Sequence, residues 1–138
     1  MTIAAIDYGK RRLGIAACDA AGIVVYPAGV IQRRSLKHDL ATLSARLKEL
    51  DATRVIIGWP LNMDGTVGPA AHAAEQFAQH LREATGLEVE LYDERLSTFE
   101  AEERLKAASK RGRRGAYVDA VAAVVILESW LAAHPNAR

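Results

Sequence analysis

Three short apolar runs fill the first 31 residues of the chain, and their close spacing restricts the fold more than any other feature. The runs cover Thr2 to Ile6, Leu13 to Cys18 and Ile23 to Ile31, with turn residues between them. Their length and content are typical of buried strands, and Pro27 is expected to bend the third run or end its pairing. Because strands joined by short loops run antiparallel, we predict an antiparallel meander.

The middle of the chain alternates between helical and extended patterns. Leucines at helical spacing follow Ser35, a residue suited to cap a helix start, and a β-branched run from Arg54 to Gly58 comes next. A second helix is expected to begin at Pro69 and end at Gly86, followed by a half-exposed strand from Glu88 to Tyr92. The residues expected to form the buried stripe of that helix are Ala70, Ala73, Ala74, Phe77, Ala78 and Leu81.

Two further helices complete the pattern. Ser97 and Glu100 form a capping box for a helix to about Ser109, and a last helix is expected from about Ala116 to Ala133. The order β-β-β-α-β-α-β-α-α predicts one α/β domain over residues 1–138, a five-stranded mixed sheet with helices on both faces. In such sheets, functional sites lie at the carboxyl ends of the parallel strands.

The sequence also excludes several classes of protein. Its single cysteine, Cys18, rules out an intramolecular disulfide, and we find no signal peptide and no apolar run long enough to span a membrane. We therefore predict a cytoplasmic protein with no membrane partner. None of the four histidines has zinc-type spacing with another histidine or with Cys18. The patterns G-x-S-x-G and G-x-x-x-x-G-K-[ST] are missing, which argues against a serine nucleophile of that type and against a P-loop.

Asp119 gives the strongest single indication of chemistry. It is the only charged residue between Val118 and Leu127. It shares a helix face with four apolar residues, Ala122, Ala123, Ile126 and Trp130. A carboxylate on a buried face is costly unless it is paired or bound to a metal ion. The structural alternatives are a helix cap or an ion pair with Arg113 or Arg114.

Two other acidic positions follow strands of the expected sheet. Asp7 ends the first strand and Asp93-Glu94 ends the last, although a turn at Asp7 and a favourable helix-start position for the other pair are alternatives. Side chains alternate along a strand, so at most one of Asp93 and Glu94 is expected to face Asp7. Acidic side chains that converge with Asp119 at one sheet end need a cation between them. Oxygen ligands favour Mg²⁺ or Mn²⁺, and two such ions suit phosphodiester cleavage.

Net charge is only +1, but basic residues gather in two places. One segment without acidic residues contains Arg104, Lys106, Lys110, Arg111, Arg113 and Arg114. Beside a carboxylate site such a cluster suits a nucleic-acid backbone, with a solvated loop as the alternative. The shorter run Lys10-Arg11-Arg12-Leu13 lies between Gly9 and Gly14 and could hold a phosphate. On this run alone we favour a plain hairpin with solvated charges.

Taken together, these residues resemble the YqgF family, also called RuvX, the pre-16S rRNA nucleases or Holliday junction resolvases of bacteria. Any single stretch of the resemblance is weak, whereas four in family order across nearly the whole chain are highly specific. The stretches are Ile6-Asp7-Tyr8-Gly9 with Arg12 and Gly14; Gly58-Trp59-Pro60-Leu61-Asn62-Met63-Asp64-Gly65; Asp93-Glu94-Arg95-Leu96-Ser97-Thr98; and Asp119 with Ala122, Ala123, Ile126 and Leu127.

The resemblance implies an RNase H-like fold and a catalytic, metal-binding trio of Asp7, Glu94 and Asp119 with Mg²⁺ or Mn²⁺ as cofactor. It implies Glu94 rather than Asp93, a choice that alternation leaves open. The implied activity is divalent-metal hydrolysis of phosphodiester bonds, in 5′-end processing of pre-16S rRNA, in resolution of branched DNA, or in both.

Nucleic acid is accordingly the expected partner. The residues predicted to contact it are Arg12, Lys110, Arg111, Arg113 and Arg114. A non-catalytic nucleic-acid-binding module of the same fold is the alternative, and the intact acidic trio favours the enzyme. We expect a monomer or a weak homodimer, since resolving a two-fold junction would require a dimer.

Overall fold

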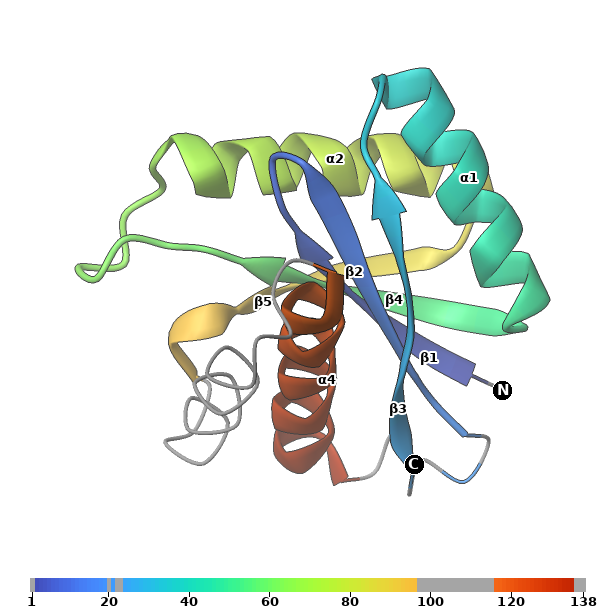
Figure 1. Cartoon of the computed structure of the whole chain (residues 1–138). Helices are drawn as coiled ribbons and strands as arrows, with labels where there is room; N and C mark the ends of the chain where they lie inside the picture. Colours follow the sequence, from blue (N-terminus) through green and yellow to red (C-terminus); the bar gives the residue numbers. More distant parts are fainter. Residues whose placement is uncertain (1, 20, 22–23, 97–115, 136–138) are drawn as a thin grey trace.

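A computed structural model of the chain describes residues 2–19, 21, 24–96 and 116–135. Figure 1 shows the elements of these ranges. In chain order they are β1 (Thr2–Tyr8), β2 (Arg12–Cys18), β3 (Val25–Gln32), α1 (Leu36–Glu49), β4 (Ala52–Trp59), α2 (Pro69–Thr85), β5 (Glu88–Asp93), the 3₁₀ helix η1 (Glu94–Leu96) and α4 (Ala116–Ala133). The predicted alternation is confirmed within these ranges. The helix expected from residue 97 to 109 lies outside the described residues.

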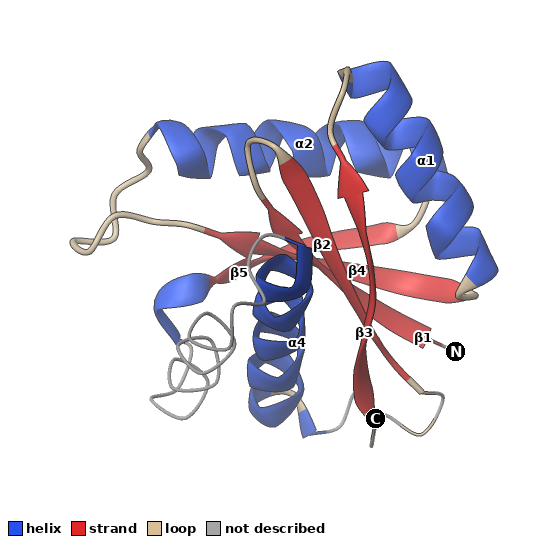
Figure 2. Ribbon diagram, viewed as in Figure 1, coloured by secondary structure: helices blue, strands red, loops and turns tan. Residues whose placement is uncertain are grey.

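The described strands form one mixed sheet in the order β3-β2-β1-β4-β5 (Figure 2). β1 pairs antiparallel with β2, and β2 pairs antiparallel with β3, which confirms the meander. β4 pairs in parallel with both β1 and β5. The carboxyl ends of β1, β4 and β5 therefore meet at one end of the sheet, with β1 in the centre.

The pairing of β3 with β2 continues through Pro27, with a shift in register. Ala16 of β2 pairs with Pro27, whereas its neighbour Ile15 pairs with Gly29, so the register shifts by one residue between them. β3 lies at the edge of the sheet, where a residue without a backbone N–H is tolerated. Gly29 has a φ of 117°, a conformation that glycine adopts without strain.

Helices cover both faces of this sheet, as predicted (Figures 1 and 2). α1 and α2 pack on one face through residues such as Leu43 and Phe77, and α4 packs on the other through Leu127 and Trp130. None of the helices within the described ranges is both long and apolar enough to cross a membrane.

The stripe predicted for α2 is partly wrong. Ala71 is fully buried, whereas Ala70 is exposed and Ala73 is only partly buried. The other predicted members of the stripe, Ala74, Phe77, Ala78 and Leu81, are buried. Alanines stand at all of these neighbouring positions, so the periodicity of the sequence does not decide which of them faces the sheet.

A buried carboxylate fixes the connection between β3 and α1. Asp39 is 1% exposed and accepts hydrogen bonds from Nε of Arg33 and from the backbone N–H of Arg34, both at 3.0 Å. Burial alone would raise the pKa of Asp39, but these donors lower it overall. The side chain of Ser35 caps α1 as predicted, because it accepts from the backbone N–H of His38 at 3.1 Å.

Candidate active site

Asp7 lies near the carboxyl end of the central strand, on the face that α4 covers. Alternation along β1 places it on the same face as Ala5, which belongs to the core under α4. Burial raises the pKa of Asp7 to about 7, and the nearby carboxylates of Glu94 and Asp119 add to this shift. An acidic side chain is affected in this way only by charges in its neighbourhood. The structure thus brings together the three acids that the sequence places far apart.

Glu94 approaches Asp7 from the other side of β4. It follows β5 as the first residue of η1, and its carboxylate lies over Gly58 of β4, where a Cβ would stand only 2.2 Å from Oε1 of Glu94. Ile6 of β1 pairs with Ile57 of β4. The next residues along the two parallel strands, Asp7 and Gly58, are therefore neighbours. Burial raises the pKa of Glu94, and the charge of Asp93 adds to the shift.

Asp93 is engaged in a different contact. Its Oδ2 accepts from Nη2 of Arg95 at 2.8 Å, and its Oδ1 accepts from the backbone N–H of Arg95 at 2.9 Å. Nη1 of Arg95 in turn donates to the carbonyl of Met63 at 3.2 Å. Asp93 therefore holds the loop after β4 against η1, and Glu94 is the acid that faces the site. The role of Arg95 was not predicted, although its spacing of two residues from Asp93 suits such a turn.

Asp119 lies in the first turn of α4 and is paired with an arginine. Nε of Arg12 donates to its Oδ2 at 2.5 Å, and the two side chains are 32% and 22% exposed. An ion pair was one of the alternatives for Asp119, but the partner is Arg12 of β2. The alternative partners, Arg113 and Arg114, lie outside the described residues, as do Lys110 and Arg111.

Two glycines make room for these acids on either side of Asp7. Gly14 pairs with Asp7 across β2, and a Cβ on it would lie 2.1 Å from the backbone oxygen of Asp119. On the β4 side of Asp7, a Cβ on Gly58 would likewise collide with the carboxylate of Glu94. The bare backbone at both positions lets α4 and η1 approach the central strand closely.

Substituting these two glycines is expected to produce different defects. Gly14→Ala would push against the backbone of α4, which cannot yield locally, so we expect a loss of about 1–3 kcal/mol in the free energy of unfolding. Gly58→Ala would press mainly on the flexible carboxylate of Glu94, so we expect at least a roughly tenfold loss of nuclease activity with a smaller loss of stability. Urea unfolding and cleavage assays on both variants test this. Full activity of Gly58→Ala would show that Glu94 does not need this position.

Only oxygen atoms are offered by the acids of this site, which fits a hard cation such as Mg²⁺ or Mn²⁺. Among the described residues, no three side chains of the ligating types already stand close enough to enclose a metal ion. The carboxylate of Asp119 is paired with Arg12. The pKa of Asp7 is raised first by burial and then by repulsion from the other two carboxylates, and a bound cation would offset that repulsion.

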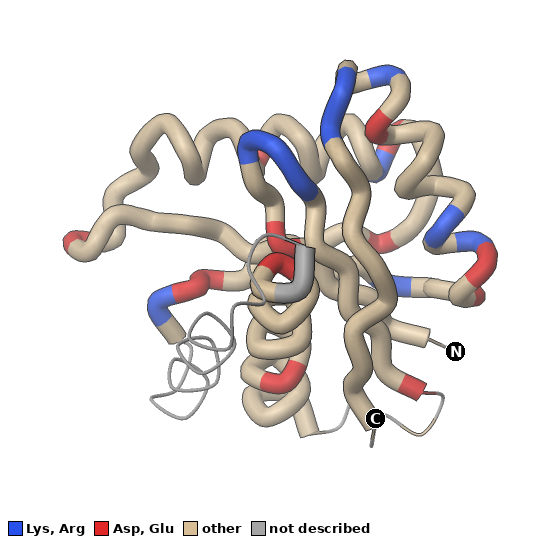
Figure 3. The backbone as a smooth tube through the Cα atoms, in the orientation of Figure 1, with Lys and Arg blue, Asp and Glu red and all other residues tan. Residues whose placement is uncertain are grey.

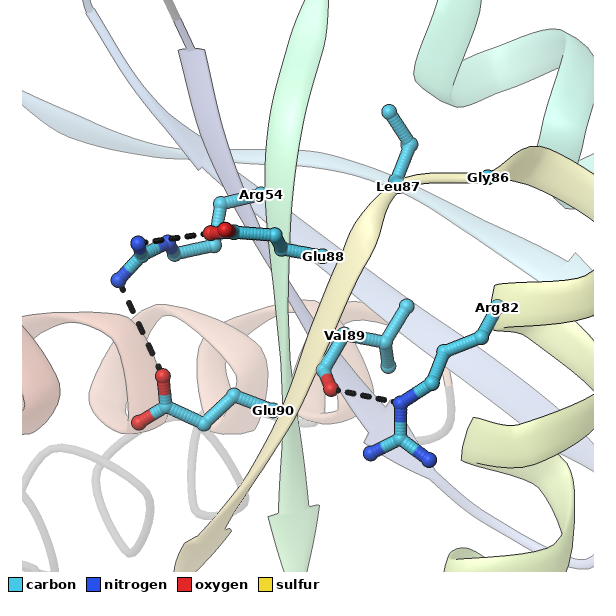
Figure 4. Close-up of a pocket in the computed structure, with 7 residues that line it drawn as sticks. All are labelled: Arg54, Arg82, Gly86, Leu87, Glu88, Val89 and Glu90. Atoms are coloured by element: carbon cyan, nitrogen blue, oxygen red, sulfur yellow. Dashed lines mark hydrogen bonds and ion pairs between the residues drawn. The ribbon is translucent and has the colours of Figure 1, made fainter.

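A pocket of about 500 Å³ lies at the opposite end of the parallel strands (Figure 4). Its polar side chains contact one another: Arg54 pairs with Glu88 at 2.7 Å and with Glu90 at 3.9 Å. Arg82 of α2 donates from Nε to the backbone oxygen of Val89 in β5 at 3.0 Å. The pocket is thus at the amino end of β5, away from Asp7 and its neighbours.

Comparison with known proteins identifies the family of the chain. The chain matches the profile of RuvX, described as Holliday junction resolvase, over residues 1–133. It belongs to the RuvX family. A relative from Anaeromyxobacter sp. (strain Fw109-5) is 47% identical over 128 residues, which cover 91% of this chain and 93% of the relative. A relative from Myxococcus xanthus (strain DK1622) is 44% identical over 130 residues, 94% of this chain and 86% of that one. Both carry the name "Putative pre-16S rRNA nuclease".

Solved structures place this RuvX chain in the RNase H-like fold. RuvC of Thermus thermophilus in complex with a Holliday junction substrate matches with a TM-score of 0.61 at 14% identity over 96% of each chain. The fowlpox virus Holliday junction resolvase matches with a TM-score of 0.59 at 10% identity, covering 96% of this chain and 99% of that one. The predicted fold is thereby confirmed. Family membership makes the chain a nuclease, a hydrolase of phosphodiester bonds.

Proposed function

We propose that this RuvX-family nuclease depends on a divalent metal ion and processes the 5′ end of pre-16S rRNA. Its proposed metal ligands and catalytic residues are Asp7, Glu94 and Asp119. The position of Asp7 carries the proposal: a carboxylate at the centre of the sheet end, with its pKa raised to about 7 by burial and by the other two acids. Such a shift lowers the stability of the metal-free protein and serves no purpose in packing, whereas shifts of this kind gather at functional sites.

A divalent cation held by these oxygens would supply the Lewis acidity that hydrolysis of a phosphodiester bond requires. The rest of the site belongs to the chain itself. The central strand fixes Asp7, η1 holds Glu94 over Gly58, and the first turn of α4 presents Asp119. Arg12 stands beside Asp119, where its planar guanidinium suits contact with a phosphate of the substrate.

The names of the relatives support RNA as the substrate. Processing of an rRNA precursor would place the enzyme in the cytoplasm. Resolution of a four-way DNA junction is the second candidate, and it is supported by the description of the family and by the likeness to RuvC bound to such a junction. That activity would require two copies of the chain, because a junction presents two symmetric cleavage points.

The substrate test uses labelled oligonucleotides of matched length as single-stranded RNA, single-stranded DNA, duplex and four-way junction, the RNA spanning a 16S precursor 5′ boundary. Each is incubated with Mn²⁺, Mg²⁺ or EDTA. We expect cleavage of the RNA at a defined position with either metal and none in EDTA. Cleavage confined to the junction would favour the second candidate. Binding without cleavage under every condition would leave only the non-catalytic module.

A further inference from the structure

A strip of basic side chains lies at the same end of the sheet as Asp7. It comes from the turn between β1 and β2, the connection after β3 and the first turn of α1, and its exposed members are Lys10, Arg11, Arg34 and Lys37. We call these four residues the basic strip. The turns that carry it adjoin, because the backbone N–H of Arg33 donates to the carbonyl of Arg11 at 2.8 Å. Figure 3 shows both turns in blue at one end of the molecule.

The basic strip is held on a rigid frame. Nη1 of Arg33 donates to the carbonyl of Gly9 at 3.0 Å, and its guanidinium lies 4.6 Å from the ring centroid of Tyr8. Asp39, buried below the connection, fixes both Arg33 and the backbone of Arg34. The exposed cations therefore start from fixed backbone positions, so less conformational freedom is lost when a ligand binds.

Within the described ranges, no acidic side chain pairs with the basic strip. In the part of the chain that the structure describes, none of its four members takes part in an ion pair. No acidic residue occurs between Tyr8 and Gly14 or between Gln32 and His38. In a protein with a net charge of only +1, this leaves a local positive surface available to an anionic partner.

The basic strip also begins close to the acids. Lys10 follows Asp7 by three residues, so the two Cα atoms are at most about 10 Å apart, the length of three extended residues. Arg12, in the same turn region, reaches back to Asp119. A strand whose phosphodiester group lies at Asp7 thus meets the basic strip within a few nucleotides. The hairpin with solvated charges that the sequence favours does not account for a second basic turn placed beside the first.

We propose that the basic strip binds the phosphate backbone of the nucleic-acid substrate beyond the bond to be cleaved. The inference rests on the proposed function, because it assumes that the substrate strand enters at Asp7. The ligand chemistry is that of consecutive phosphodiesters, which RNA and DNA share, so sequence-independent and salt-dependent binding is expected.

The test measures binding of labelled single-stranded RNA, single-stranded DNA and a four-way junction by fluorescence anisotropy in EDTA, across a salt series. The variant Lys10→Gln/Arg11→Gln/Arg34→Gln is expected to bind about 100-fold more weakly at 0.1 M salt than wild type. Its plot of log K against log[salt] should be flatter by about 2–2.7, since each phosphate contact contributes roughly 0.7–0.9. The affinity for RNA and the affinity for DNA are both expected to fall, because the basic strip contacts the phosphate backbone that the two share.

Two matched variants serve as controls. Lys48→Gln removes one exposed charge near the far end of α1, and its affinity is expected to stay within about twofold of wild type. Lys10→Arg/Arg11→Lys/Arg34→Lys keeps every charge and should retain the wild-type salt slope. If the triple glutamine variant loses its native circular-dichroism spectrum, the single variants Arg34→Gln and Arg34→Lys are compared instead. Arg34→Gln is then expected to bind roughly fivefold more weakly than Arg34→Lys.

Unchanged affinity and slope in a natively folded triple variant would overturn the proposal. Polyglutamate that binds to wild type more tightly than the nucleic acids at equal charge concentration, and loses that binding in the triple variant, would also overturn it, because the basic strip would then be a site for acidic protein. A cleavage assay on the same preparations separates the two claims. A wild type that binds through the basic strip but cleaves nothing contradicts the proposed function alone, and a triple variant that binds and cleaves as wild type contradicts the basic strip alone.

Discussion

In EDTA, the free energy of unfolding is expected to fall as the pH rises from about 4 to about 7. The pKa of Asp7 is about 7 in the folded protein and 3.8 in its ordinary state, so over this range the folded protein keeps a proton that the unfolded chain has released. Stability must then decrease with rising pH, and the full penalty is present above pH 7. For a shift of this size the penalty is on the order of 4 kcal/mol, at about 1.4 kcal/mol per pH unit.

Asp7→Asn isolates this effect from the other titrating groups. Urea unfolding in EDTA at several pH values should show the variant more stable than wild type at pH 8, with the difference vanishing near pH 4. Asp39→Asn is the opposite control, because the lowered pKa of Asp39 stabilises the folded protein at neutral pH and that contribution is lost as the pH falls. A difference between wild type and Asp7→Asn that does not vary with pH would contradict the account of Asp7.

Cleavage is expected to fall by about 10³-fold or more in Asp7→Asn and in Glu94→Gln. Each variant keeps the shape of the side chain but removes a negative oxygen from the proposed cation site, and such an ion contributes several kcal/mol to transition-state stabilisation. Asp93→Asn is the matched control, one residue from Glu94. Because Asp93 positions Arg95 and the loop at Met63, we expect only a roughly tenfold loss from it. A natively folded Asp93→Asn as inactive as Glu94→Gln would reverse our choice between the two acids.

Much of the fold follows from local patterns in the sequence. The last helix has the predicted bounds, Ala116–Ala133, and α2 begins at Pro69 and is capped by Gly86 with a φ of 71°. These positions depend on backbone preferences of a few adjacent residues, which a sequence displays directly. Local patterns do not determine which face of α2 is buried, because that depends on how the helix is rotated against the sheet.

The site was less accessible to local reasoning. Arg12 and Asp119 are 107 residues apart, and only the packing of α4 on β2 makes them partners. Alternation separates Asp93 from Glu94 but cannot choose between them until the face that carries α4 is known. On β5, Glu90 accepts from the indole of Trp130 in α4 at 2.8 Å. Glu94 follows the strand as the first residue of η1, and its carboxylate lies over Gly58 together with Ile126 of α4. The two turns that carry the basic strip likewise become neighbours only through the register of β2 and β3.

The central claim is that Asp7, Glu94 and Asp119 form a divalent-cation site for phosphodiester hydrolysis. Its most direct test titrates Mn²⁺ into EDTA-treated wild type and Asp7→Asn while cleavage of the labelled substrate is followed. The account predicts no cleavage before Mn²⁺ is added, a saturable rise in wild type, an arrest when EDTA is returned in excess, and no cleavage by Asp7→Asn at any Mn²⁺ concentration. Equal cleavage by both proteins in excess EDTA, from preparations free of other nucleases, would contradict it.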